Sequence, residues 1–302
     1  MTELESYIRK VVVLVNRRSG FAGNFNSLNR GINESWEDGR RLVYYQFLQN
    51  LEDGRRKVAS AVSENADAVL VAGGDGTIST VGASLINTGV IMGAVPFGSG
   101  NGFARHFEIP LAPEKALRSL ANGRRLDIDV GMVDGRPFFV TCSMAWDAAI
   151  VRSFEKYPVR GILPYVFAGV QEFFEYEPQK LTVRIDDSEE AVFNDALLFS
   201  VANLSQYGGG ARIAPNACPD DGFLELIVAA RKDIGKLLAN IARFFDGRLT
   251  EVPEVFMRKF KKLTVYREKP SPIQVDGDLV DAGKEVVFSV DPKALRILAP
   301  DK

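Results

Sequence analysis

Short runs of consecutive apolar residues alternate with longer amphipathic stretches from the start of the chain to about Arg125. Such runs, bounded by turn residues, are typical of strands buried on both faces, whereas the amphipathic stretches are typical of helices. The expected strands span residues 10–16, 41–47, 66–72 and 90–95, and the expected helices span residues 53–65, 77–86 and 113–122. This alternation predicts an α/β domain with a Rossmann-like parallel sheet that is covered on both faces.

The pattern changes near Arg125, after which strands follow one another quickly and alternate in polarity. Turn signals such as Asp134-Gly135 and Asp276-Gly277 separate several of them. The expected strands span residues 126–130, 137–141, 181–185, 196–201, 223–228, 263–266, 273–276 and 285–290, with helices at 161–175 and 233–245. We therefore expect an α/β domain over residues 1–125, joined by about 292–302, and a mainly antiparallel β domain over residues 126–291.

Composition and charge narrow the class of protein. The 302 residues are 46% hydrophobic and 25% charged, which is typical of an ordered globular chain. The formal net charge of −2 argues against a nucleic-acid binder with a basic face. One histidine and two cysteines exclude a Cys/His zinc cluster and a disulfide framework. Reduced thiols at Cys142 and Cys218 are favoured over a single disulfide, as in a cytoplasmic protein.

The segment from Thr77 to Ala104 contains no charged residue and superficially resembles a membrane span. It also carries many glycines, a proline and two asparagines, which a spanning helix would not tolerate in this number. We expect a buried helix, a buried strand and a glycine loop in succession. The acidic N-terminus is not a signal peptide.

A glycine loop, Gly73-Gly74-Asp75-Gly76-Thr77, lies between an expected buried strand and an expected helix. This arrangement collects free backbone N–H groups and the positive end of a helix, which together bind phosphate. Thr77 is the expected N-cap. A carboxylate at Asp75 does not suit a plain anion cradle, so it indicates a nearby Mg²⁺ or a proton acceptor. The alternative is an ordinary strand-to-helix turn that happens to contain an aspartate.

Two further loops favour the nucleotide interpretation. Pro96-Phe-Gly-Ser-Gly-Asn-Gly102 follows the next strand, and Asn16-Arg-Arg-Ser-Gly20 follows the first. Loops at the carboxyl ends of parallel strands form the ligand-binding edge of an open α/β sheet. None of the three is a Walker A motif or a good dinucleotide fingerprint.

In these motifs the sequence resembles the diacylglycerol kinase catalytic-domain family of lipid kinases, which includes bacterial diacylglycerol kinases and the sphingosine and ceramide kinases. The matching segments are Asn16…Ser19-Gly20, Gly73–Thr77, Pro96–Asn101, Asp220-Asp221-Gly222 and Val275-Asp276-Gly277-Asp278. The resemblance implies an N-terminal nucleotide-binding domain, a C-terminal β-sandwich domain and an ATP site in the cleft between them. It also implies transfer of the ATP γ-phosphoryl group to a lipid hydroxyl, with diacylglycerol giving phosphatidic acid as the leading case.

The resemblance further implies roles for individual residues. Asp276 is a candidate base, Asp75 would act at the phosphates or as the base, and Asp278 is a further expected catalytic residue. Asp221, with backbone carbonyls near Cys218 and Phe223, would hold a structural Mg²⁺, and Asp147 would face the substrate. The implied nucleotide contacts are Asn16, Ser19, Gly20, Gly73, Gly74, Asp75, Gly76, Thr77, Gly98, Ser99, Gly100 and Asn101.

Two departures from the family pattern bear on these roles. The second loop, Gly98-Ser-Gly-Asn-Gly102, is closer to the sphingoid-type kinases than to the usual bacterial pattern. Asp278 stands where the family usually has glutamate, which is one methylene longer.

A lipid hydroxyl is a poor acid, so a carboxylate near the γ-phosphate is needed to accept its proton. Between Asp75 and Asp276, the sequence favours Asp276 as the base and Asp75 on the nucleotide side.

The partner is a lipid at a membrane surface, and a homodimer is compatible with the sequence. An apolar face in residues 162–174 packs on the β domain or contacts the bilayer. The rival functions are a soluble-metabolite kinase such as an NAD kinase and a non-catalytic lipid- or nucleotide-binding protein.

Overall fold

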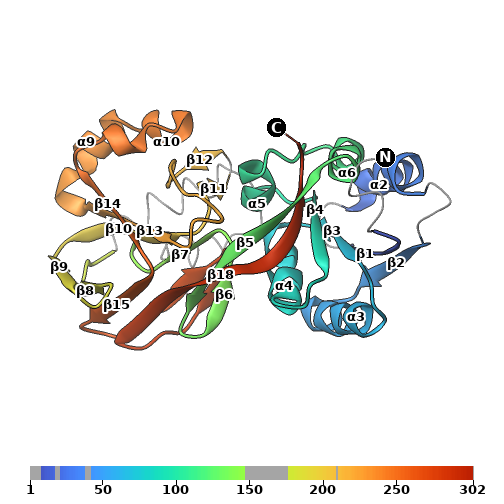
Figure 1. Cartoon of the computed structure of the whole chain (residues 1–302). Coiled ribbons are helices and arrows are strands. Elements are labelled where there is room, and N and C mark those ends of the chain that lie inside the picture. The colour runs from blue at the N-terminus through green and yellow to red at the C-terminus, as the bar shows by residue number, and fades with distance from the viewer. Residues whose placement is uncertain (1–7, 18–20, 38–41, 147–175, 209, 302) are drawn as a thin grey trace. The chain divides into compact units, whose positions relative to one another are not determined.

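The computed structural model describes residues 8–17, 21–37, 42–146, 176–208 and 210–301. The chain divides into two compact units (Figure 1). The first comprises the described residues within 1–128, 208–210 and 293–302, and the second comprises those within 129–207 and 211–292.

A parallel sheet forms the centre of the first unit, with strand order β2-β1-β3-β4. Its strands are β1 (Lys10–Asn16), β2 (Leu42–Leu48), β3 (Ala68–Gly73) and β4 (Ile91–Pro96). Every residue of β3 and β4 is buried, because helices cover both faces of the sheet. Figure 1 shows α2 and α6 on one side of this sheet and α3 and α4 on the other. The predicted α/β fold is therefore confirmed.

Five helices are described in this unit: α2 (Phe21–Ser35), α3 (Leu51–Ser63), α4 (Asp75–Leu85), α5 (Gly102–His106) and α6 (Pro113–Ala121). The sequence did not predict α2, which is rich in asparagine and glycine. The prediction that Thr77 caps α4 was wrong, because this helix begins at Asp75 and Gly74 is its N-cap.

Helices α2 and α6 meet at Gly31. A Cβ atom added there would lie 2.8 Å from Cδ1 of Leu117 and 3.0 Å from Cα of Glu114. The fully buried Trp36 lies just beyond α2 and donates its indole N–H to the Leu117 carbonyl at 3.0 Å. Gly31 is therefore required for the close approach of the two helices.

Two mainly antiparallel sheets form the second unit. One has the order β14-β13-β10-β7-β16-β17, and in the other β18, β15, β8 and β9 pair in succession, with β5 paired to β6. The strands are β5 (Arg124–Val133), β6 (Arg136–Phe138), β7 (Thr141–Ser143), β8 (Leu181–Ile185), β9 (Glu189–Phe193), β10 (Ala196–Ala202), β13 (Leu224–Ala230), β14 (Val255–Phe260), β15 (Lys262–Arg267), β16 (Ile273–Val275), β17 (Asp278–Val280) and β18 (Glu285–Ala299). A short pair, β11 (Gln206–Gly208) and β12 (Ala211–Arg212), is separate.

Side chains from both sheets share one core. Phe199 and Leu226 from the first sheet and Val265 and Phe288 from the second belong to the same buried cluster. A β-sandwich is the arrangement in which two sheets bury one face each against the other. The predicted antiparallel β-sandwich is confirmed.

The helix expected over residues 233–245 is interrupted. A 3₁₀ turn (Arg231–Asp233) leads into α9 (Ile234–Ala239), and α10 (Arg243–Asp246) follows after a turn. A second 3₁₀ turn spans Leu249–Glu251. The helix expected over residues 161–175 lies outside the described residues.

Strand β18 extends beyond the expected residue 290 and reaches Ala299. Its last part belongs to the first unit, where Ile297 pairs with Met92 of β4 in parallel. Neither cysteine forms a disulfide, as the sequence predicted, and Cys142 is buried while Cys218 is exposed. Among the described helices, none is long and apolar enough to cross a membrane.

Replacing Gly31 with alanine should lower the free energy of unfolding by about 1–3 kcal/mol, because the added methyl group collides with the α6 backbone. Gly54→Ala in α3 is the matched control, since its Cβ would meet only Leu48 methyl groups at 3.7 and 4.0 Å. The free energy of unfolding of that variant should rise by about 0.5–1 kcal/mol, because alanine has a higher helix propensity than glycine. Equal effects of the two substitutions in denaturant titrations would contradict this account of the helix contact.

Candidate functional site

The turn from β3 to α4 begins at Gly73, where an added side chain would collide with Thr77. A Cβ atom on Gly73 would lie 2.6 Å from Cβ of Thr77. The Gly74 carbonyl accepts the N–H groups of Thr77 and Ile78, each at 3.0 Å, which closes the first turn of α4. The N–H groups that precede these in the turn have no partner within the helix, so the helix start can bind an anion.

The second glycine loop lies directly against the first. The Phe97 N–H donates to the Gly73 carbonyl at 2.8 Å, and a Cβ on Gly98 would lie 2.8 Å from Cα of Gly74. Asn101 adopts a left-handed conformation with φ 51°. Its side chain accepts the Gly98 N–H at 3.0 Å and donates to the Gly98 carbonyl at 2.7 Å. The two predicted phosphate loops therefore form one backbone surface.

Asp75 connects these loops through its side chain. Its Oδ1 accepts the N–H of Phe103 at 3.4 Å, and a Cβ on Gly100 would lie 3.0 Å from its Oδ2. Burial raises the pKa of Asp75, while the backbone N–H groups of Phe103, Asn101 and Gly102 act in the opposite direction. The carboxylate thus faces the start of α5 and ties the second loop to the first turn of α4.

The end of β1 joins the same group. Asn16 donates its Nδ2 hydrogen to Oγ1 of Thr77 at 2.7 Å. Thr77 is therefore part of the site through its hydroxyl group rather than as an N-cap. Ser19, Gly20 and Asp147 lie outside the described residues, so their expected roles stay predictions.

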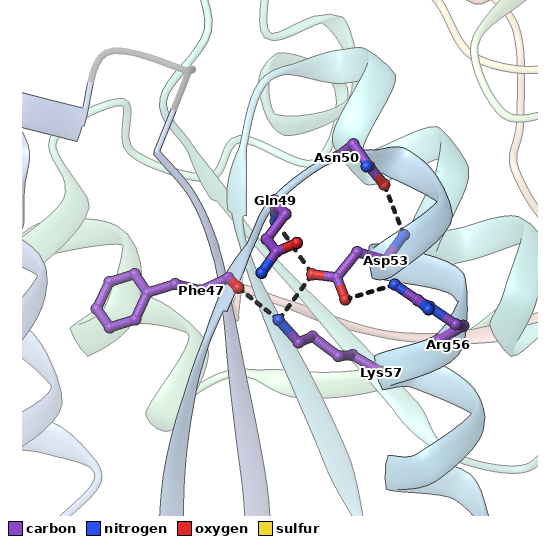
Figure 2. Close-up of polar contacts among 6 residues, drawn as sticks. All are labelled: Phe47, Gln49, Asn50, Asp53, Arg56 and Lys57. Carbon is purple, nitrogen blue, oxygen red and sulfur yellow. Dashed lines mark hydrogen bonds and ion pairs between the residues drawn. The ribbon is translucent and has the colours of Figure 1, made fainter.

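The end of β2 supplies a fourth element of this sheet edge, which the sequence analysis missed (Figure 2). Asn50 caps α3 by accepting the N–H of Asp53 at 2.8 Å. The Asp53 carboxylate accepts the ammonium of Lys57 at 2.7 Å and the N–H of Gln49 at 3.0 Å. The Lys57 ammonium also donates to the Phe47 carbonyl at 2.5 Å. The hydrogen bond from Lys57 is the main cause that lowers the pKa of Asp53.

This network fixes the turn after β2, next to the end of β1. The guanidinium of Arg17, just beyond β1, lies 5.7 Å from the centre of the Phe47 ring. The Asn50-x-x-Asp53 spacing is a helix-start signal that could have located this turn from the sequence.

His106 ends α5, which follows the second loop. Burial lowers its pKa to about 4, so the imidazole is neutral at physiological pH. Its ring packs edge-on against that of Phe107. The neighbouring Arg105 donates Nε–H to the Gly100 carbonyl at 3.1 Å and so supports the loop.

In the second unit, the carboxylate of Asp276 is engaged by backbone donors. It accepts the N–H groups of Phe139 and Val140, each at 2.8 Å, and that of Thr141 at 3.1 Å. Oxygens that already accept several N–H groups favour the ionised form and are poor proton acceptors. These contacts fix the turn between β6 and β7, and the preference for Asp276 as the base stays a prediction.

Asn203 holds the same turn from the other side and was missed by the sequence analysis. Its Nδ2 donates to the carbonyls of Phe139 at 3.1 Å and Asp129 at 3.0 Å, and its own N–H donates to Val140 at 3.0 Å. The side chain is buried. A polar residue directly after the buried strand β10 is the only signal that the sequence offers for it.

Asp278 begins β17, two residues after Asp276, and differs from it in environment. Its side chain is exposed, and within the described residues its carboxylate accepts no hydrogen bond. Partial loss of hydration raises its pKa, and the nearby Arg136 acts in the opposite direction. Of the candidate carboxylates Asp75, Asp276 and Asp278, Asp278 belongs to an exposed residue and the other two to half-buried residues.

The loop expected to hold a structural Mg²⁺ is arranged around an ammonium group instead. Oδ2 of Asp221 lies 2.6 Å from Nζ of Lys259, and its Oδ1 accepts the N–H of Phe223 at 3.0 Å. The Cys218 thiol donates to Asp220. In the described part of the chain, no three His, Cys, Asp or Glu side chains converge on a point. The expected site combines Asp221 with backbone carbonyls near Cys218 and Phe223, so the Mg²⁺ assignment stays a prediction.

Comparisons with known proteins assign both units to described families. Residues 10–133 match the diacylglycerol kinase catalytic domain. Residues 140–299 match the YegS C-terminal NAD kinase beta sandwich-like domain.

Curated relatives and a solved structure agree with these matches. The chain is 30% identical to a diacylglycerol kinase of Mycobacterium tuberculosis, over 97% of this chain and 96% of that one. It is 29% identical to a "Probable lipid kinase YegS-like" of Pectobacterium atrosepticum, over 96% and 95% of the two chains. A crystal structure of a diacylglycerol kinase from Bacillus anthracis has the same fold, with a TM-score of 0.74 at 18% identity over 96% of this chain and 97% of that one.

Because His106 is the chain's only histidine, its titration can be followed as a single imidazole signal. We expect its NMR Hε1 resonance to titrate near pH 4 instead of 6.5. The unfolded chain binds this proton below pH 6.5 and the folded chain does not, so stability should fall by about 3 kcal/mol between pH 6.5 and 4. A His106→Gln variant should lack this part of the pH dependence. A midpoint near 6.5 in the folded protein would contradict the burial argument.

Proposed function

Since this chain belongs to the diacylglycerol kinase catalytic-domain family and is a lipid kinase, we propose that it transfers the γ-phosphoryl group of ATP to the free hydroxyl of diacylglycerol. The product is phosphatidic acid. The observation that carries this proposal is the single backbone surface formed by Gly73–Thr77 and Gly98–Asn101 at the carboxyl edge of a parallel sheet. Relatives that match almost the whole chain and are named diacylglycerol kinase support the choice of acceptor.

In this proposal the first unit binds the nucleotide. ATP enters as its Mg²⁺ complex, and its phosphates accept N–H groups at the start of α4 and those of Ser99 and Gly100 in the second loop. Phosphoryl transfer depends mainly on positioning and on neutralising charge, which a rigid set of backbone donors supplies. Asp75 contributes by holding the two loops together and not by taking a proton, because its carboxylate is buried against the start of α5.

The proton of the lipid hydroxyl goes to Asp278 in this proposal. Its carboxylate is exposed, and the raised pKa brings it closer to that of an effective general base. Asp276 fixes the turn between β6 and β7 through three backbone N–H groups, which leaves proton transfer to its neighbour.

A second acceptor class, sphingoid-type or other hydroxyl lipids, is favoured by one observation. The loop Gly98-Ser-Gly-Asn-Gly102 follows the sphingoid-type pattern more closely than the usual bacterial one. The rival soluble-metabolite kinase and non-catalytic binder are superseded, because both units match lipid-kinase relatives.

The acceptor can be identified with the purified protein, [γ-³²P]ATP and a total lipid extract. We expect labelled phosphatidic acid, identified by mass spectrometry of the phosphorylated lipids. Label in another lipid class would identify that lipid, and not diacylglycerol, as the acceptor. Absence of label in every lipid, beside intact ATP binding, would overturn the proposed transfer.

Asp278→Asn should lower kcat by roughly 10²–10⁴-fold with little change in KM for ATP, because the proton acceptor is lost while the phosphate site is untouched. Asp278→Glu restores the family's usual residue and should retain most of the activity. Both variants should unfold at the wild-type midpoint, since the side chain is exposed. Wild-type kcat in Asp278→Asn would remove this residue from the role.

A further inference from the structure

The segment that contains α9 and α10 presents an apolar surface to solvent. Leu238, Ile241 and Phe245 are 60%, 50% and 55% exposed, and the small Ala242 beside them is exposed as well. Their spacing of three and four residues places them on one side of a helical path. We refer to Leu238, Ile241, Ala242 and Phe245 as the α9–α10 face.

The opposite side of this segment anchors it to the second unit. Leu237 is buried and Phe244 packs against the same cluster, which includes Ile227 of β13 and Val252. Hydrogen bonds continue through the turn between the two helices, for example from Ile241 N–H to the Leu238 carbonyl at 3.2 Å. The segment is therefore held by its inner residues, and the exposed face contributes nothing to the core. In Figure 1, α9 and α10 follow one another along the margin of this unit.

Basic side chains border the α9–α10 face. Residues 231–254 contain five basic and four acidic side chains, a formal charge of +1, whereas the whole chain has a net charge of −2. Lys236 pairs with Glu254 at 3.0 Å and Arg243 pairs with Glu251, and both remain part of the rim. Exposed Lys232 and Arg248 lie at the two ends of the segment, and Arg248 pairs with Asp246 at 2.6 Å. An apolar strip with a basic border is complementary to an anionic lipid surface.

The size of the face argues against a second copy of the chain as its occupant. A stable protein–protein interface usually involves about 20–30 residues on each side. The α9–α10 face offers three large apolar side chains on a narrow strip. A bilayer needs no matching surface, because a few apolar side chains can enter the boundary between headgroups and acyl chains.

We propose that the α9–α10 face is a docking surface for a bilayer with anionic headgroups, into which Leu238, Ile241 and Phe245 insert. This inference rests on the proposed function, since a diacylglycerol acceptor resides in a bilayer. Docking through the second unit would bring the protein to its substrate without a membrane-spanning segment. The basic border adds an attraction that weakens as salt screens it.

The direct test is co-sedimentation with vesicles of phosphatidylcholine and phosphatidylglycerol that contain no diacylglycerol. The double variant Ile241→Gln/Phe245→Gln should bind at least roughly tenfold more weakly than wild type, because it removes two inserting side chains. Val192→Gln is the matched control, since Val192 is 51% exposed on β9 of the same unit. It should bind like wild type. Equal binding of wild type and the double variant, or no wild-type binding to these vesicles, would overturn the proposal.

A second readout separates this idea from the proposed function. With short-chain diacylglycerol dispersed in neutral detergent micelles, the double variant should keep wild-type kcat, since docking to a bilayer is not needed. Loss of kcat there would overturn the assignment of these residues to docking alone. If wild type is a dimer by light scattering and the double variant a monomer, the face is an interface between copies and the bilayer proposal fails.

Discussion

The buried carboxylate of Asp75 is the contact on which the nucleotide side of this enzyme depends. It lies in the first turn of α4 and accepts the Phe103 N–H at the start of α5, so it spans the two glycine loops. Burying a charge is costly unless hydrogen bonds compensate it, and backbone N–H groups offset part of that cost here, while burial still raises the pKa of Asp75. The backbones of Gly74 and Gly98 can then approach so closely that no side chain fits at Gly98. A rigid cradle of N–H groups is the consequence.

The second unit uses a carboxylate in a related way. Asp276 gathers three backbone N–H groups of the turn between β6 and β7, and Asn203 holds a carbonyl of the same turn. In both units the carboxylate of an aspartate from a recognisable motif accepts backbone N–H groups of a neighbouring turn or helix start. Asp278, whose carboxylate is exposed, is left for the chemistry that we propose. The Lys259 ammonium neutralises Asp221 in the loop where a metal was expected.

The sequence predicted those elements whose signal is local. The strands β1, β3 and β4 were predicted because their residues are apolar without interruption, which reflects burial on both faces. Helix α2 was missed because its composition is poor for a helix. Its stability comes instead from Leu28 and Ile32 in the core and from the contact at Gly31. The role of Asp276 could not be read from the sequence, since its hydrogen-bond partners are 135–137 residues away. The glycine loops were found as motifs, but only the structure gives their contact through Asp75.

The dissociation constant for ATP, measured by calorimetry on Gly98→Ala, tests most directly whether the paired loops form the phosphate site. The added methyl group must push Gly98 away from Cα of Gly74, 2.8 Å from its position, without entering the hydrophobic core. The account predicts at least a roughly tenfold weaker affinity for ATP, about 1.4 kcal/mol, in a protein that keeps its wild-type circular dichroism spectrum. An unchanged dissociation constant in a folded Gly98→Ala protein would contradict it.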